Sequence, residues 1–195
     1  MKILLTAFKA FGSDDRNSSQ EVVLKLDLDI EGVEIIKVFL PTVYDIEVYK
    51  ELLMEHKPDV MLLCGQSAGR PTVTVEYQGL NLMYAITPDE KGVLKLGEVI
   101  IPEGDNSLLA TIPAIDIVEK INDPCLRLSV SAGGYICNLS LYASLYYAKQ
   151  LGLDTKIGFV HFPLFYGQRD DFMPNVEITK MIEILRKIVL ILAGK

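Results

Sequence analysis

The sequence predicts an α/β protein: a single-domain, three-layer αβα sandwich around a mostly parallel, twisted sheet, with a small hairpin insertion. Three observations predict it. Short, continuous apolar runs such as residues 60–64 and 156–161 are typical of strands buried on both faces. Segments with helical spacing separate these runs, as crossover connections between parallel strands require. The 195 residues, half of them hydrophobic, suit one core, so we expect one domain over residues 1–195.

In the first third of the chain, expected strands and helices alternate. An apolar run at the N-terminus opens into a glycine-containing loop, and Pro41 ends a β-branched run. Apolar residues then recur at helical spacing until Pro58. The expected elements are a strand at 2–7, a helix at 18–28, a strand at 33–40, a helix at 42–56, a strand at 60–64 and a loop at 65–70.

The middle of the chain has a different pattern. Polar and apolar residues alternate over 72–77, and most of them are β-branched. Residues 87–104 are rich in proline, glycine and charged residues. We therefore expect residues 72–104 to form hairpin-like or irregular structure inserted above the sheet. The remaining expected elements are a helix at 106–120 interrupted by Pro113, a strand at 127–131, a largely buried helix at 135–151, a strand at 156–161 and an amphipathic helix at 176–192.

Composition and charge exclude several classes of function. The formal net charge of −7 leaves no basic stripe for phosphates, so nucleic acid is not expected as a partner. The N-terminal apolar run is too short for a signal peptide, and no run approaches the roughly 20 uncharged residues of a membrane helix. We expect a cytoplasmic protein. Cys64, Cys125 and Cys137 are odd in number and lack metal-binding spacing, so we expect no disulfide framework, metal or cofactor.

Cys137 is the candidate nucleophile. In open parallel sheets, ligands bind beyond the carboxyl ends of the strands, and residues 131–138 are expected at such an end. Cys137 lies in the first turn of the expected helix at 135–151, where unpaired N–H groups and the helix dipole should lower the pKa of its thiol. The alternative is a cysteine that only packs in the core of an apolar helix.

His161 is the candidate general base, and Glu76 the candidate partner of its imidazole. His161 closes the expected strand at 156–161, which should place it near Cys137 at the same sheet edge. The other histidine, His56, lies among charges at a helix end and is interpreted as solvated. Glu76 lies in a β-branched segment, where an acid either faces solvent or is held inward by a charged partner.

Together these segments resemble pyroglutamyl peptidase I, also called pyrrolidone carboxyl peptidase, a family of cysteine exopeptidases. Residues 131–138, SAGGYICN, resemble the family's nucleophile signature S-A-G-x-Y-[LI]-C-N. Residues 159–163, FVHFP, resemble its histidine motif F-[IV]-H-x-P. Residues 65–70, GQSAGR, resemble the G-x-x-x-G-R loop that precedes its acidic residue, here Glu76. The resemblance runs from residue 1 to about residue 168.

The resemblance implies a thiol protease that removes an N-terminal pyroglutamyl residue from peptides through a thioacyl-enzyme. In that mechanism Cys137 would attack the carbonyl carbon, His161 would shuttle the proton and Glu76 would hold the imidazole. The implied partner is a peptide with N-terminal pyroglutamate, and the implied assembly is a homotetramer.

The resemblance also implies a pocket for the lactam ring. The family's T-G-F-x-P-F-G loop corresponds to residues 6–12, TAFKAFG, which keep both aromatic residues but change one glycine and the proline. Lys9 is a departure near the expected pocket, and Ile86 stands where many members have the arginine of A-R-I-P-D. Backbone N–H groups at the helix start are therefore expected to hold the oxyanion. The expected substrate-binding residues are Phe8, Phe11, Asn17, Gln66, Tyr135 and Ile136.

Two other functions fit the same residues. With Lys9 and Ile86 altering the pocket, the Cys137, His161 and Glu76 set could serve an amidase for another small lactam or acyl amide. From a different class, the chain could be a non-catalytic homologue that binds a small lactam or a peptide N-terminus. A phosphate cradle at residues 65–70 is disfavoured because no Gly-Lys-Ser/Thr follows.

Overall fold

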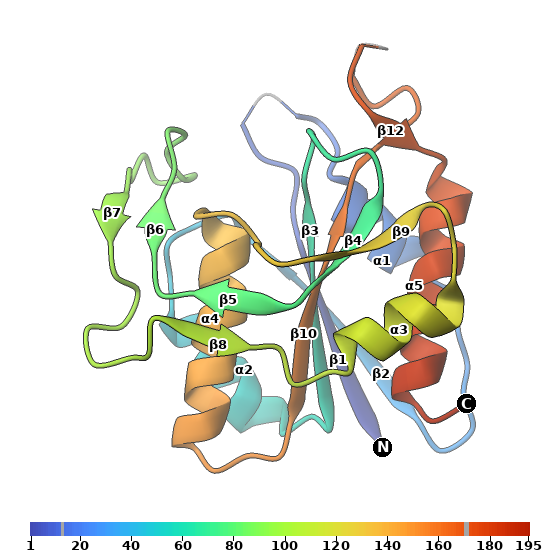
Figure 1. Cartoon of the computed structure of the whole chain (residues 1–195), viewed down its shortest axis with the longest axis horizontal. Coiled ribbons are helices and arrows are strands. Elements are labelled where there is room, and N and C mark those ends of the chain that lie inside the picture. The colour runs from blue at the N-terminus through green and yellow to red at the C-terminus, as the bar shows by residue number, and fades with distance from the viewer. Residues whose placement is uncertain (13, 170–171) are drawn as a thin grey trace.

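A six-stranded mixed sheet forms the centre of the computed structural model, which describes residues 1–12, 14–169 and 172–195 (Figure 1). In spatial order its strands are β2 (Glu34–Leu40), β1 (Lys2–Phe8), β3 (Val60–Gln66), β10 (Lys156–Phe162), β4 (Val73–Glu76) and β9 (Leu126–Ser129). The first four run parallel, β4 is antiparallel to β10, and β9 is parallel to β4. The sheet is therefore mostly parallel, as predicted.

Helices cover both faces of this sheet (Figure 1). Side chains of β3 alternate between two apolar clusters: Leu62 and Cys64 join one, Met61 and Leu63 the other. The predicted three-layer αβα arrangement is confirmed. One face is covered by α1 (Ser18–Lys25), α3 (Ala114–Ile121) and α5 (Ile178–Leu192), and the other by α2 (Glu47–His56) and α4 (Ile136–Gln150).

In the described parts of the chain, three small two-stranded sheets supplement the central one. The prediction that residues 72–77 belong to an insertion is wrong, because all four residues of β4 are buried in the main sheet. The predicted hairpin character applies from residue 78 onward, where two pairs are antiparallel. The small sheets pair β5 (Gln78–Leu80) with β8 (Ser107–Leu109), β6 (Met83–Tyr84) with β7 (Leu96–Glu98), and β11 (Leu164–Phe165) with β12 (Asn175–Val176).

Two predicted helices begin later than expected, and both have a local cause. The helix predicted at 106–120 is preceded by β8 and starts after Pro113, whose ring cannot continue a helix toward the N-terminus. The helix predicted at 42–56 starts at Glu47, because the backbone forms turns after Pro41 and the Asp45 carboxylate accepts the N–H of Glu47 at 3.1 Å.

The direction of β9 corrects another expectation. The segment containing Cys137 was predicted to follow a strand parallel to the others, but β9 runs opposite to β10. The chain returns from the end of β9 to the start of α4 through residues 130–135 (Figure 1). The N-terminus of α4, rather than a strand end, therefore carries the nucleophile candidate to the site.

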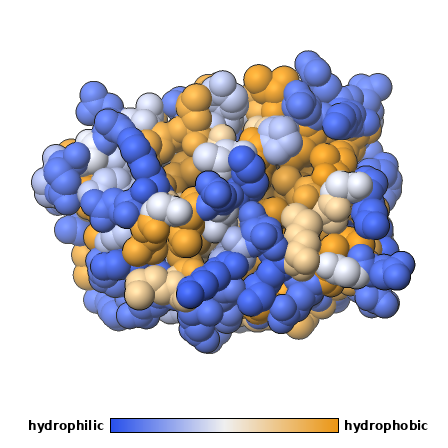
Figure 2. Space-filling view, turned by 90° about the horizontal axis from the view of Figure 1, so that it is seen from below, coloured by the Kyte–Doolittle hydropathy of each residue, from blue (hydrophilic) through white to orange (hydrophobic). Residues whose placement is uncertain are grey.

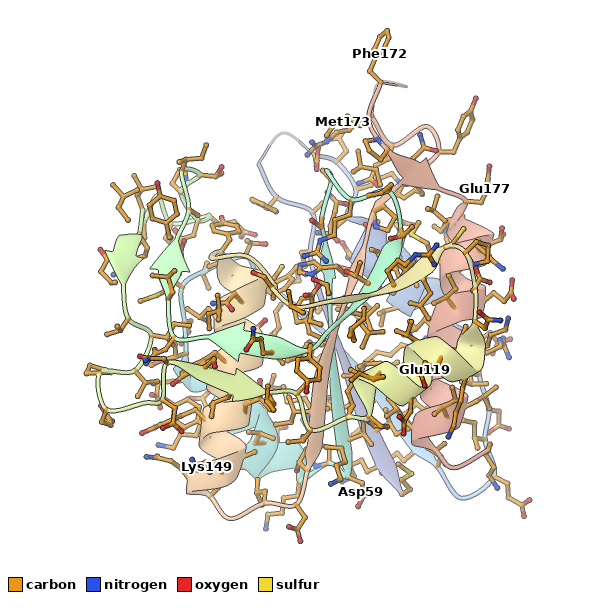
Figure 3. The ribbon with its side chains drawn as sticks, in the orientation of Figure 1. Asp59, Glu119, Lys149, Phe172, Met173 and Glu177 are labelled. Carbon is orange, nitrogen blue, oxygen red and sulfur yellow. The ribbon has the colours of Figure 1, made fainter. Side chains whose placement is uncertain are left out.

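Asp59, just before β3, lies at the end of the sheet opposite to Phe172 and Met173 (Figure 3). Figure 2 views the end that includes Asp59, where hydrophilic residues form much of the surface with apolar patches between them. Within the described residues, none of the helices has the length and apolar character needed to cross a membrane.

Candidate active site

His161 and Glu76 form a buried pair. Nδ1 of His161 lies 2.8 Å from Oε1 of Glu76. Antiparallel pairing of β10 with β4 places Phe159 opposite Glu76, so both members of the pair project to the sheet face that α4 covers. His161 is 3% exposed and Glu76 is fully buried. Of the two alternatives for Glu76, the structure shows the inward one.

Two further groups donate to the same oxygen of Glu76. Nη1 of Arg70 donates to Oε1 at 2.6 Å, and the Thr74 hydroxyl donates to the same oxygen at 2.9 Å. The other terminal nitrogen of Arg70 donates to the carbonyl of Ser131 at 2.8 Å. Oε2 of Glu76 is buried and has no hydrogen-bond partner among the described residues. The donors thus converge on one carboxylate oxygen, which favours its ionised form.

The pKa shifts of the pair define its resting state. Burial raises the pKa of Glu76, but the His161 hydrogen bond and the Arg70 charge outweigh it, and the pKa lies below its ordinary value. Burial lowers the pKa of His161, and the charge of Arg70 lowers it further. The Glu76 carboxylate raises it, but the pKa remains below its ordinary value. At neutral pH the pair is a carboxylate and a neutral imidazole. With Nδ1–H donated to Glu76, Nε2 keeps a lone pair that can accept a proton.

The sulfur of Cys137 lies over Gly65 of β3, the strand that pairs with the strand of His161. Gly65 on β3 is the register partner of His161 on β10. A Cβ atom placed on Gly65 would lie 2.7 Å from Sγ of Cys137 and 2.7 Å from Cζ of Phe159. The rings of Phe159 and His161 are 4.6 Å apart between centroids. The structure therefore brings thiol and imidazole together on one sheet face, over adjacent positions of neighbouring strands.

The resting thiol of Cys137 is neutral. Burial raises its pKa to about 12, and the Glu76 carboxylate adds to the rise, whereas Arg70 and the backbone N–H oppose it. The predicted lowering of this pKa is wrong. Partial removal of water from the half-buried thiol outweighs the favourable helix N-terminus. Cys137 consequently needs a base to become a thiolate.

The start of α4 supplies free backbone donors and is held firmly. Tyr135 is the N-cap and makes no side-chain cap hydrogen bond within the described residues, which leaves first-turn N–H groups available there. Asn138 is fully buried and bonds three backbone groups: it accepts from the N–H of Leu80 at 2.8 Å and donates to the carbonyls of Leu80 and Leu82 at 2.8 and 2.9 Å. This side chain fixes the position of the helix start against the segment that follows β4.

A cavity of about 330 Å³ adjoins Cys137, and we call it the active-site cavity. All six predicted substrate-binding residues line it. Lys9, predicted near the pocket, is exposed and is not among the lining residues. The lining consists of Phe8, Phe11, Gly12, Asp14, Asn17, Thr42, Gln66, Ala68, Thr87, Tyr135, Ile136, Cys137 and Arg169.

The two predicted amide side chains are partly engaged with the protein. Oε1 of Gln66 accepts from the N–H of Ser18 at 2.7 Å, and Nε2 donates to Asp14 at 3.1 Å. Nδ2 of Asn17 donates to the carbonyl of Lys9 at 3.3 Å. Because each amide nitrogen carries two hydrogens, each keeps one donor for a ligand.

Sequence reasoning missed several residues of this site. Arg70 was noted only as part of a loop motif, although a cation six residues before an inward acid is a signal for pairing. Asp14 and Arg169 line the cavity and form an ion pair, with Nε of Arg169 at 2.7 Å from Oδ1 of Asp14. Thr42 lines it with a buried hydroxyl that lacks a partner among the described residues. No periodicity marks these loop residues.

The remaining cysteines and histidine lie elsewhere. Cys64 is fully buried in the core on the other sheet face, and burial raises the pKa of its thiol. Cys125 is half-buried beside the same cluster. The backbone carbonyl of His56 accepts from Nζ of Lys2 at 2.9 Å, near the start of β1 and far along the sheet from Gly65. In the described part of the chain, no group of three or more His, Cys, Asp or Glu residues could hold a metal ion.

Comparison with known proteins places the chain in a family. Residues 1–191 match the family model described as pyroglutamyl peptidase. A pyrrolidone-carboxylate peptidase of a Thermoanaerobacter species is 38% identical over 100% of this chain and 99% of its own. One from Thermococcus onnurineus is 34% identical over 97% of each chain.

Solved structures of this family have the same fold as this chain. A mutant pyrrolidone carboxyl peptidase from Pyrococcus furiosus superposes with a TM-score of 0.93 at 26% identity, covering 100% of this chain and 99% of its own. Pyroglutamyl peptidase I of Bacillus amyloliquefaciens gives a TM-score of 0.89 at 29% identity, over 95% and 93% of the two chains. The protein with the buried Glu76 and His161 pair beside Cys137 therefore belongs to the pyroglutamyl peptidase family.

Proposed function

We propose that this chain is a cysteine exopeptidase that removes an N-terminal pyroglutamyl residue from peptides, with Cys137 as nucleophile, His161 as general base and Glu76 as the group that orients the imidazole. Family membership supports the reaction. The observation that supports the residue roles is the position of the Cys137 sulfur over Gly65, the register partner of a histidine held by Glu76.

Acylation begins with a neutral thiol and a neutral imidazole. Nε2 of His161 accepts the Sγ proton as sulfur bonds to the carbonyl carbon that follows the lactam ring. The carbonyl oxygen becomes an oxyanion, which accepts hydrogen bonds from first-turn N–H groups of α4, including that of Cys137. The imidazolium then gives its proton to the departing amine as the C–N bond breaks. The product of this half-reaction is a thioacyl-enzyme and a shortened peptide.

Deacylation reuses the same groups. His161 accepts a proton from water as the water oxygen attacks the thioester carbon. The C–S bond breaks, sulfur recovers the proton from the imidazolium, and free pyroglutamate leaves. Glu76 remains ionised throughout and stabilises the imidazolium in both halves of the cycle.

The cavity lining suits a neutral, flat ring. Phe8 and Phe11 supply aromatic surface, and the Phe11 and Tyr135 rings lie 6.2 Å apart between centroids. The lactam carbonyl can accept the free amide hydrogens of Gln66 or Asn17. Ile86 does not line this cavity, so the oxyanion role of the backbone N–H groups requires no contribution from that position.

The experiment is hydrolysis of a fluorogenic pyroglutamyl amide. The wild-type chain should release the fluorophore, and Cys137→Ala should lose activity by a factor on the order of 10³ or more. Cys125→Ala is the matched control and should retain activity, since its sulfur lies outside the cavity. Absence of release by the wild type, or full release by Cys137→Ala, would refute the proposal.

We also propose, from the resemblance, a homotetramer located in the cytoplasm that acts on pyroglutamyl peptides. Sedimentation velocity on the purified chain tests the assembly. A species of one-chain mass, about 22 kDa, at micromolar concentration would reject it.

A further inference from the structure

A second cavity adjoins the active-site cavity. It has a volume of about 490 Å³ and we call it the outer cavity. Phe11, Thr87 and Tyr135 line both cavities, so the two share a wall. Among the described residues, the lining of the outer cavity consists of Phe11, Tyr84, Ala85, Ile86, Thr87 and Tyr135.

The described lining of the outer cavity is largely apolar and uncharged. Ile86 is 83% exposed, and Tyr84 is 55% exposed. An isoleucine so accessible to water on an otherwise folded rim gains stability when another apolar group covers it. None of the six lining residues carries a charge that would attract an acidic or basic side chain.

The wall of the outer cavity is a built structure tied to the segment before Cys137. The N–H of Tyr84 donates to the carbonyl of Gly134 at 2.8 Å, and a Cβ on Gly134 would lie 2.4 Å from the Tyr84 carbonyl oxygen. The hydroxyl of Tyr135 donates to the carbonyl of Pro88 at 2.9 Å. The β6 strand stands beside the N-terminal end of α4 (Figure 1). The outer cavity therefore keeps a fixed position relative to the thiol.

We propose that the outer cavity binds the side chain of the residue that follows the pyroglutamyl residue, and that it favours an aliphatic or aromatic side chain. This inference rests on the proposed function. With the lactam ring in the active-site cavity beside Cys137, the next residue must leave that cavity, and the shared wall of Phe11, Thr87 and Tyr135 leads to apolar surface. Ile86 is then a specificity-determining residue.

Three substrates and two variants test the inference. Pyroglutamyl-leucine, pyroglutamyl-asparagine and pyroglutamyl-glycine amides differ only in this side chain, and leucine and asparagine are close in size. For the wild type, kcat/KM for the leucine substrate should exceed that for the asparagine substrate by roughly tenfold or more. Ile86→Asn should reduce this ratio to about one to three, mainly by loss on the leucine substrate.

Leu94→Asn is the matched control, because Leu94 is also an exposed apolar residue of this region but lines neither cavity. Its leucine-to-asparagine ratio should equal that of the wild type. Equal kcat/KM for the three substrates, or an equal loss on all three in Ile86→Asn, would overturn the inference while leaving the proposed function standing. No hydrolysis of any of the three, nor of the fluorogenic amide, would instead reject the proposed function.

Discussion

Among single residues, Glu76 is the anion that the polar side chains around it share. One of its oxygens receives His161, Arg70 and Thr74, so a cation and an imidazole share one anion. Arg70 opposes protonation of His161, whereas Glu76 favours it. The pKa of His161, the proposed general base, thus results from burial and Arg70, which lower it, and from Glu76, which raises it.

Because the pKa of His161 is lowered, its neutral form persists below the ordinary titration range of histidine. The acid limb of kcat/KM for the wild type should therefore lie below pH of about 6.5. Measurement of kcat/KM from pH 4 to 8 on the fluorogenic amide checks this. An acid limb centred above pH of about 7 would contradict the lowered pKa.

Arg70→Gln should move that acid limb upward. Loss of the guanidinium removes a positive charge that disfavours imidazolium, so the pKa of His161 rises and the neutral base is lost at a higher pH. The expected shift is roughly one pH unit. Arg70→Lys keeps the charge and is the control, with a limb close to that of the wild type. An unchanged pH profile in Arg70→Gln would limit Arg70 to a structural role.

Glu76→Gln should move the same limb in the opposite direction. Loss of the carboxylate removes the group that favours imidazolium, so the pKa of His161 falls further. The plateau of kcat/KM should also fall by a factor on the order of 10³, since the imidazole loses its orienting anion. Shifts of the two variants in the same direction would show that Arg70 and Glu76 do not act on His161 as described.

Between elements, the close approach of α4 to β3 depends on a residue without a side chain. Gly65→Ala would place Cβ 2.7 Å from the Cys137 sulfur and from the Phe159 ring, and one of them must move. We expect kcat/KM to fall at least about 100-fold, with a stability loss of about 1–3 kcal/mol. Gly69→Ala, in the loop that follows β3, is the control, since its Cβ would meet nothing within 4 Å. Wild-type activity in Gly65→Ala would reject this packing.

The start of α4 is tied to the segment after β4 by one side chain. Asn138→Ala removes the partner of the Leu80 N–H and of the Leu82 carbonyl, and it leaves the Leu80 carbonyl with the Leu82 N–H alone. The free energy of unfolding should fall by roughly 2–4 kcal/mol. Urea denaturation measures this, with Asn175→Ala as an exposed control that should change it by less than about 0.5 kcal/mol. A loss in Asn138→Ala as small as in the control would contradict the anchoring role.

For the molecule as a whole, both helical layers share one sheet, so they should unfold together. Leu53 and Leu185 are fully buried in the clusters on opposite faces. Leu53→Ala and Leu185→Ala should each lower the free energy of unfolding by about 2–5 kcal/mol while keeping a single transition. Calorimetry checks this for residues 1–195, which we expect to form one domain. Two separate transitions, each shifted by one variant only, would show that the layers are independent units.

Strands were predicted well where the signal lies in their own residues, and less well where their place depends on a distant partner. Continuous apolar runs identified the strands at 60–64 and 156–161 within two residues, because burial on both faces leaves a mark in the run itself. The place of β4 was mispredicted, since alternation in 72–77 shows that a strand forms but not which strand it pairs with. The predicted helix starts at residues 42 and 106 were wrong. The helices begin only after Asp45, which accepts the N–H of Glu47, and after Pro113.

The amino-acid sequence alone determined the fold class and the family, and it supplied the candidate reactive side chains, because apolar periodicity and local motifs lie in neighbouring residues. The pKa values of Cys137 and His161, the contact of Arg70 with Glu76, and the outer cavity depended on folding. Each of them is set by desolvation or by a partner from a distant segment, and neither quantity exists until the chain has packed.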